Sequence, residues 1–256
     1  MKPTLAGRTI LVTRPVEQAA PLVRALERRG ARVLVAPTIR LIPARSAALT
    51  TALRDLADGR FAWLVLTSQT TVEVLRDRLA SSREVRAKVA AIGDGTASAF
   101  RRWTRRDPDL VPPTFTTAAL GRAFPRGSGR VLTARADIAP EGLEDALARK
   151  GWDPVRVDAY RTVFARSLPR DARTALRRGE VDAVTFTSAS TVRGFANVVG
   201  RQRSGFAAVC IGPVTAREAK VNALPVRRVA SPHTIEGLVQ AVERALEPPR
   251  RRADRT

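Results

Sequence analysis

The sequence contains very few of the residue types that build disulfides, metal clusters and most covalent catalytic centres. Its 256 residues include one cysteine, Cys210, and one histidine, His233. A single cysteine excludes an internal disulfide and a cysteine metal cluster. A single histidine excludes His-rich metal sites and argues against a Ser-His-Asp triad. Cys210 lies in an apolar run, so we expect a buried core thiol rather than a nucleophile.

Long apolar runs and aromatic residues are also scarce. No run approaches the roughly 20 residues needed to cross a membrane, and the first residues lack the apolar region of a secretory signal. Aromatic residues make up 5% of the chain and hydrophobic residues 44%, so aliphatic side chains must build the core. We expect a cytoplasmic protein with one large domain or two of modest size.

Acidic residues are few relative to basic ones. Lysine and arginine total 45 against 24 acidic residues, which gives a formal net charge of +21 and favours anionic partners. Three interpretations remain open: a solvated arginine-rich surface, a polyanionic small molecule, or a nucleic acid. The chain lacks the interleaved aromatic residues typical of single-strand binders. Residues 247–256 have no apolar periodicity, and we expect them to form a disordered basic tail.

Apolar strands alternate along the chain with amphipathic helices of 8–15 residues. This alternation predicts an α/β fold with mainly parallel sheets. Strands are expected at 9–12, 33–35, 38–43, 63–66, 89–92, 110–111, 130–133, 154–163, 183–186, 207–211 and 226–229.

The second half of the chain repeats the pattern of the first. Trp63 to Val72 reads as an apolar strand, a Thr-Ser turn and the start of a helix, and the same pattern recurs 120 positions later as AVTFTSASTV. Arg14 and Gly30 likewise match Arg135 and Gly151 at an offset of 121. The halves, roughly 7–124 and 129–246, are therefore two copies of one α/β unit. Ligands of such sheets bind at the carboxyl ends of the strands.

The turns at these strand ends are candidate anion sites, because the first N–H groups of a helix can hold an anion. A Thr-Ser turn can equally be only a helix cap. Gly93-Asp94-Gly95 lacks the third glycine of a dinucleotide loop, and no Walker loop is present, so nucleotide binding is not expected. The candidate turns contain Thr13, Arg14, Thr67, Ser68, Gly93, Arg135, Thr187, Ser188 and Gly212.

Tyr160 is the only tyrosine, and its partner in the repeat is Ile39. Duplicated segments usually keep a residue type that serves packing, so this difference points to a function. The alternative is a half-buried tyrosine whose hydroxyl has a hydrogen-bond partner. No pair of carboxylates and no covalent nucleophile stands out. The residues alone thus describe a two-domain α/β protein that binds an anion.

Several short motifs, in this order, resemble the uroporphyrinogen-III synthase family over residues 5–246. Each is weak alone, and their order and spacing carry the resemblance. They are LVTRP at 11–15, LTS at 66–68, VDAYRT at 157–162, FTSAS at 186–190, IGPVTA at 211–216 and SPHTIEGL at 231–238.

The resemblance implies two similar parallel-sheet, flavodoxin-like α/β domains joined by a two-stranded β-ladder, with the active site in the cleft between them. The expected discontinuous domain comprises residues 1–36 and 165–256, and the inserted domain residues 42–156. Residues 36–41 and 157–164 would form the connecting ladder.

The resemblance also implies the reaction. Linear hydroxymethylbilane, a polycarboxylate, would lose water and close with inversion of its D ring, with no cofactor. Tyr160 matches the family's active-site tyrosine, which is proposed to assist the leaving hydroxyl. Thr67, Ser68, Ser188 and Thr215 match cleft positions, and Arg14 and Arg135 are added as charge partners. The full expected substrate-binding set is Thr13, Arg14, Thr67, Ser68, Gly93, Thr96, Arg135, Thr187, Ser188, Ser190, Gly212 and Thr215.

We expect a monomer with a small-molecule substrate, no membrane association, no metal and no nucleic-acid partner. Two alternatives from other classes remain. A non-enzymatic polyanion or nucleic-acid binder would show an affinity that falls steeply with salt. A two-lobed solute-binding protein would need an export signal, which was not found.

Overall fold

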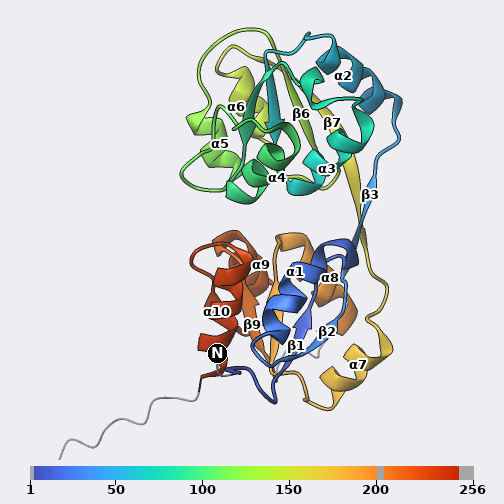
Figure 1. The fold of residues 1–256 in the computed structure, drawn as a ribbon, viewed down its shortest axis with the longest axis vertical. Helices are drawn as coiled ribbons and strands as arrows, with labels where there is room; N and C mark the ends of the chain where they lie inside the picture. Colours follow the sequence, from blue (N-terminus) through green and yellow to red (C-terminus); the bar gives the residue numbers. More distant parts are fainter. Residues whose placement is uncertain (1–2, 201–204, 248–256) are drawn as a thin grey trace, which may run out of the picture. The chain divides into compact units, whose positions relative to one another are not determined.

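The structure, a computed structural model, describes residues 3–200 and 205–247, so the predicted tail lies outside the described residues except for Glu247. The chain divides into two compact units, Met1–Arg40 with Val163–Thr256, and Leu41–Thr162 (Figure 1). Each unit is a five-stranded sheet covered by helices. The described residues include no helix long and apolar enough to cross a membrane.

The first unit has the strand order β10-β9-β8-β1-β2, and all four pairings are parallel. β1 comes from the first half of the chain and pairs with β8 from the second half, so this sheet combines strands of both repeats. Its strands are β1 Thr9–Val12, β2 Arg32–Val35, β8 Ala183–Phe186, β9 Ala207–Cys210 and β10 Val226–Val229; its helices are α1 Val16–Glu27, α7 Arg170–Arg177, α8 Ala189–Val199, α9 Pro213–Val221 and α10 Ile235–Leu246.

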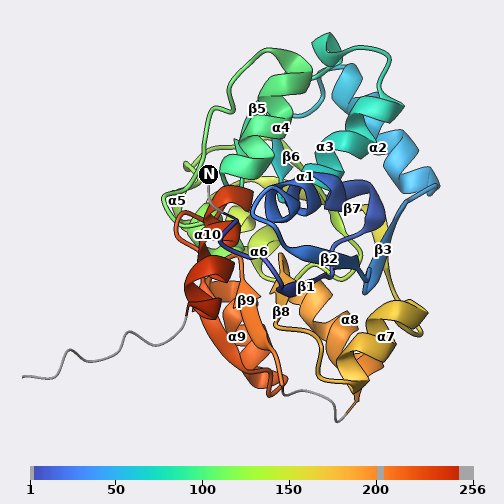
Figure 2. The same ribbon diagram turned by 60° about the horizontal axis from the view of Figure 1, so that its bottom comes forward.

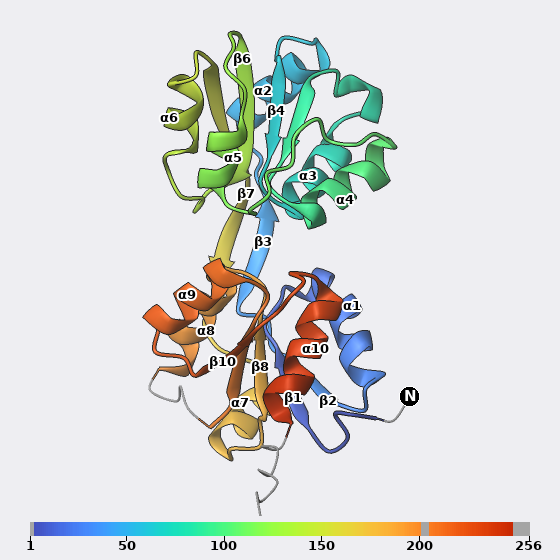
Figure 3. The same cartoon turned by 90° about the vertical axis from the view of Figure 1, so that its left-hand side faces the viewer.

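Helices cover both faces of this sheet, which explains why its central strands β1, β8 and β9 are buried throughout. Leu11, Val184 and Phe186 face α7, α8 and α9. Two of these helices, α7 and α8, lie next to each other in Figure 2. Ile10 and Val12 point to the other face, where α1 and α10 pack side by side (Figure 3). Cys210 is buried in the first of these clusters, as predicted, and burial raises the pKa of its thiol to about 12.

The second unit has the strand order β3-β7-β6-β4-β5. The pairings among β7, β6, β4 and β5 are parallel. Its strands are β3 Ile39–Pro43, β4 Trp63–Leu66, β5 Lys88–Ala91, β6 Arg130–Ala136 and β7 Asp153–Phe164; its helices are α2 Ala47–Ala57, α3 Gln69–Arg78, α4 Asp94–Thr104, α5 Thr117–Ala123 and α6 Leu143–Ala148, with a 3₁₀ turn, η1, at Ser82–Glu84.

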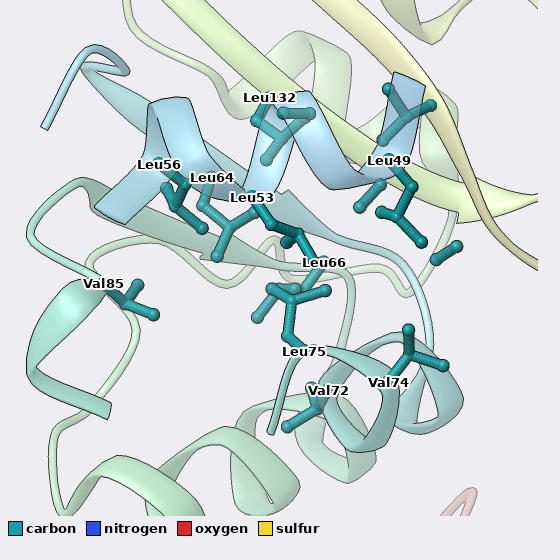
Figure 4. Packing of buried hydrophobic residues seen from close by; sticks show 14 of the residues in the cluster. Leu49, Leu53, Leu56, Leu64, Leu66, Val72, Val74, Leu75, Val85 and Leu132 are labelled. Carbon is teal, nitrogen blue, oxygen red and sulfur yellow. The ribbon is translucent and has the colours of Figure 1, made fainter. Parts of the chain in front are cut away.

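The core of this unit also has two sides. Figure 4 shows Leu49 and Leu53 of α2 packed with Leu66 of β4 and Leu75 of α3. The opposite face is covered by α5 and α6, where Trp63 and Phe124 stack in a tilted pair with ring centroids 4.8 Å apart. The sequence prediction of an α/β fold with two parallel-sheet domains is therefore confirmed.

The chain passes between the two units inside β3 and β7. The predicted ladder segment 157–164 lies within β7, and the segment 36–41 overlaps β3 only from Ile39 onward. β3 and β7 are neighbours in the second sheet. The Ala44 N–H donates to the Ala159 carbonyl at 2.9 Å, and the Ala165 N–H to the Thr38 carbonyl at 2.9 Å. Partner numbers rise in one strand as they fall in the other, so the two strands run antiparallel.

One predicted strand is wrong. Residues 110–111 do not form a strand, and Leu110 makes only a single parallel bridge, to Ala90. The reason is the Pro112-Pro113 pair that follows, because proline has no N–H to extend a ladder.

Candidate functional site

Polar turns in each unit lie at the carboxyl ends of neighbouring parallel strands. In the second unit, Thr67 and Ser68 follow β4, Gly93 follows β5, and Arg135 lies near the end of β6. In the first unit the turns after β1, β8 and β9 take the equivalent places. Parallel neighbours end at one edge of the sheet, so each unit gathers its candidate residues at one edge.

Tyr160 and Ser68 meet at this edge of the second unit, although 92 positions separate them in the sequence. The Tyr160 hydroxyl donates a hydrogen bond of 3.1 Å to the Ser68 Oγ. Ser68 is the N-cap of α3, where its Oγ accepts the Thr71 N–H at 3.0 Å. The only tyrosine of the chain is therefore bonded to one of the two repeated Thr-Ser turns.

The hydroxyl groups form one directional chain. Tyr160 donates to Ser68, Ser68 lies 3.0 Å from the Thr71 Oγ1, and Thr71 donates to the Ala134 carbonyl at 3.3 Å. Since Ser68 already accepts two hydrogen bonds, its own hydrogen points to Thr71. The lone pairs of the Tyr160 oxygen have no donor among the described residues, and its hydrogen can turn away from Ser68 by rotation about the Cζ–O bond.

A β-bulge in β7 sets the direction of Tyr160. Arg135 of β6 pairs with Asp158, but the next residue, Ala136, pairs with Tyr160, so Ala159 is the extra residue. Asp137 holds the bulged segment, because its Oδ1 accepts the Thr162 N–H at 2.9 Å and its own N–H donates to the Tyr160 carbonyl at 3.0 Å. Bulges next to functional sites commonly re-aim a side chain in this way.

Tyr160 is 7% exposed, and its surroundings keep the phenol neutral. Burial raises its pKa above the ordinary value, and the negative charges of Asp137 and Glu73 act in the same direction. The Ser68 hydrogen bond and the charge of Arg135 oppose this shift without cancelling it. At neutral pH Tyr160 is therefore a hydrogen-bond or proton donor rather than a base.

Arg135 is completely buried and ion-paired. Its Nη1 lies 3.0 and 2.9 Å from the two carboxylate oxygens of Glu144, and Thr133 donates to the same carboxylate at 2.9 Å. Burial acts to raise the pKa of Glu144, but the hydrogen bonds of its own N–H and of Thr133, with the charge of Arg135, lower it overall. Nε and Nη2 of Arg135 are buried without a hydrogen-bond partner among the described residues.

In the first unit, Ser188 and Thr191 form a complete capping box at α8. The Ser188 Oγ accepts the Thr191 N–H at 3.2 Å and lies 2.9 Å from the Ser190 Oγ. The N–H groups of Ala189 and Ser190 have no acceptor within the described part of the chain. These two donors, at the positive end of α8, can bind an anion.

The remaining predicted residues lie at the same edges with different surroundings. Thr13 is fully buried and donates to the Thr185 carbonyl at 2.7 Å, so its hydroxyl supports the sheet. Arg14 is partly buried and donates to Gln18 at 3.4 Å. Gly93 and Gly212 are the N-caps of α4 and α9, Thr96 and Thr215 are buried in the first turns of those helices, and Thr67 and Thr187 are half-buried beside their serines.

The sequence reasoning missed Glu144 and Asp137, which fix Arg135 and the bulge. A signal for both was available in the repeat. Glu144 matches Val23, and Asp137 matches Val16, at the offset of 121 that singled out Tyr160. No group of three or more His, Cys, Asp or Glu side chains in the described residues is arranged to hold a metal ion.

The chain was compared with known proteins. Residues 20–240 match the family model described as "Uroporphyrinogen-III synthase HemD". A uroporphyrinogen-III synthase of Synechococcus elongatus is 32% identical over 93% of this chain and 96% of its own length. The corresponding protein of Chlorobaculum parvum is 28% identical over 75% of this chain and 80% of its own length.

Solved structures show a similar fold. A mutant uroporphyrinogen III synthase of the extremely thermophilic bacterium Thermus thermophilus has a TM-score of 0.68 at 21% identity, covering 93% of this chain and 98% of that one. A uroporphyrinogen-III synthetase of Helicobacter pylori has a TM-score of 0.60 at 18% identity, covering 91% and 97%.

Proposed function

The chain belongs to the uroporphyrinogen-III synthase family, and on that premise we propose how its residues carry out the family reaction. The enzyme cyclises hydroxymethylbilane, with loss of water and inversion of the D ring, to uroporphyrinogen III. The reaction removes a hydroxyl group and closes a ring, so it needs a donor to the leaving oxygen and a fixed substrate conformation.

The observation that carries the proposal is the hydrogen bond between Tyr160 and Ser68. It brings a buried, neutral phenol to the N-terminus of α3, where N–H groups and hydroxyls favour an anion. We propose that Tyr160 turns its hydrogen from Ser68 to the leaving hydroxyl of the substrate. The oxygen of Ser68 keeps the Thr71 N–H as a partner during this exchange, so no buried group is left unsatisfied.

Backbone donors, rather than a separate cation for each carboxylate, are proposed to hold the substrate. The Ala189 and Ser190 N–H groups at α8 would bind one carboxylate, and the turns at Gly93 and Gly212 would bind others. Arg135 already has Glu144 as its partner, so in this proposal it acts by its charge on Tyr160. Arg14 stays a proposed charge partner of the substrate.

The defining experiment supplies purified protein with enzymatically generated hydroxymethylbilane and resolves the product isomers by chromatography. The expected product is uroporphyrinogen III, in excess over the type I isomer formed in a matched sample without protein. Equal isomer patterns in the two samples would refute the proposal. We further propose a monomeric cytoplasmic enzyme, which light scattering and cell fractionation can test.

A further inference from the structure

A cavity of about 870 Å³ lies in the second unit, and neither Thr67 nor Ser68 lines it. Its walls come from the end of β3, the first residues of α2 and a stretch of β7. β3 and β7 lie side by side in Figure 1. None of the predicted site residues lines it. Its volume lies within the range of sites for small molecules, roughly 300–1,000 Å³.

Positive charge dominates the cavity wall. Arg45, Arg156 and Arg161 line it, against a single carboxylate, Asp158. Arg45 and Arg161 are exposed and make no hydrogen bond or ion pair with other described residues. Arg156 donates only to the Ala139 carbonyl, at 3.3 Å. Three arginines against one carboxylate leave this wall with an excess of positive charge, which suits it to an anion.

The N-terminus of α2 adds to the positive potential. Ser46 caps this 11-residue helix by accepting the Leu49 N–H at 3.1 Å. The N–H groups of Ala47 and Ala48 have no acceptor in the described residues, and Ala48 lines the cavity. The dipole of the helix therefore favours negative charge at the same wall as the arginines.

The rest of the wall is apolar. Ile42 is 44% exposed there, one of few large hydrophobic side chains with that exposure in the described chain, and the exposed Pro43 continues the surface. Ala44 and Val157 line the same wall from beneath and are almost fully buried. A small inorganic anion would leave this surface uncovered. A ligand that fills the cavity must combine an apolar body with acidic groups around it.

We propose that this cavity is a second, non-catalytic site for a carboxylated tetrapyrrole macrocycle, the chemical class of the enzyme's own product. The inference rests on the proposed function for the choice of ligand. One face of the macrocycle would cover Ile42 and Pro43. Its peripheral carboxylates would reach Arg45, Arg161 and the N-terminus of α2, leaving the Tyr160 site open.

Equilibrium titration with uroporphyrin III, the fluorescent oxidised form of the product, tests the proposal. The test variant is Arg45→Ala/Arg161→Ala, in which both substituted side chains are exposed. The matched control is Arg122→Ala/Arg126→Ala, which removes the same charge from exposed positions of the same unit. Thermal unfolding establishes that both variants are folded.

We expect two bound porphyrins for the wild type and the control, and an affinity about tenfold weaker for one site in the test variant, because two charge-assisted contacts are lost. A single site in the wild type would overturn the inference. An equal loss in both variants would also overturn it, because general charge would then explain binding. The inference would also be overturned if a heparin fragment bound more tightly than uroporphyrin and the test variant lost that binding. The cavity would then be a site for polyanions in general and not for the macrocycle.

The isomer assay keeps this inference separate from the proposed function. We expect the test variant to form uroporphyrinogen III at the wild-type rate. If the wild type makes no type III isomer, the proposed function fails, whatever the titration gives. If catalysis is normal and the titration of the test variant matches the wild type, only the second site is refuted.

Discussion

Removing the carboxylate of Glu144 should destabilise the second unit far more than removing any surface charge. Glu144 is the only ion-pair partner of Arg135 among the described residues; the Arg135 side chain is 0% exposed, and that of Glu144 is 17% exposed. Glu144→Ala leaves the guanidinium buried, with its Nη1 joining Nε and Nη2 as groups without a partner. Breaking a buried pair from one side typically costs about 3–5 kcal/mol, and we expect about 3 kcal/mol because Glu144 keeps some contact with solvent.

The chain offers a selective reporter for this change. All three tryptophans, Trp63, Trp103 and Trp152, belong to the second unit, so urea unfolding followed by tryptophan fluorescence reports on that unit. The matched control is Asp77→Asn in the same unit, which removes an exposed pair with Arg76 and should cost less than about 0.5 kcal/mol. The second variant, Arg135→Met/Glu144→Leu, removes both charges and should recover most of the loss.

The pH dependence of the unfolding free energy independently tests whether the ionised Glu144 stabilises the folded protein. The folded pKa of Glu144 lies below its ordinary value of 4.5. The pair therefore contributes stability that is present above pH 4.5 and is lost as the pH falls through the folded pKa. A Glu144→Ala variant within about 1 kcal/mol of the wild type at pH 7 would refute the reasoning, because Arg135 would then be solvated.

Three further predictions concern single groups. Ser188→Asp keeps the cap of α8, because aspartate also accepts the Thr191 N–H, but its charge competes with a substrate carboxylate; we expect a raised Michaelis constant with an unchanged unfolding midpoint. Ser81→Asp, at a surface cap, is the control, and an unmoved constant would remove the α8 turn from the site. Cys210, with its thiol pKa raised to about 12, should react with a thiol reagent at pH 8 only after urea unfolding; prompt reaction of the folded protein would contradict its burial. The pKa of Tyr160 in the folded protein lies above its ordinary value of 10.0. The stability that Tyr160 contributes is therefore complete below pH 10 and is lost as the pH rises through the folded pKa. Tyr160→Phe should abolish this loss in alkaline unfolding curves.

The elements with strong local signals were predictable from the sequence. The strands that end at Val12, Leu66 and Phe186 are mostly apolar and buried throughout because helices cover both faces of their sheets. Ser68 and Ser188 begin helices where a hydroxyl cap was expected. These features depend on a few neighbouring residues, so one sequence contains enough information to place them.

Features that depend on distant contacts were not predictable in the same way. The bulge at Ala159 arises because Asp137 bonds to the backbone of β7, and nothing near Ala159 in the sequence indicates it. The pairing of Tyr160 with Ser68, and the burial of Arg135 by Glu144, likewise join residues brought together only by the sheet. The exchange of strands between the two repeats was implied by the family resemblance and not by periodicity.

The isomer ratio of Tyr160→Phe is the most direct test of the proposed role for the tyrosine. The substitution removes one hydroxyl and its 3.1 Å hydrogen bond to Ser68, and a neutral hydrogen bond contributes about 1 kcal/mol, so the protein should stay folded. With hydroxymethylbilane as substrate, we expect a slower reaction and a lower ratio of type III to type I uroporphyrinogen than for the wild type. A ratio and rate equal to those of the wild type would contradict the assignment of Tyr160 as the donor to the leaving hydroxyl.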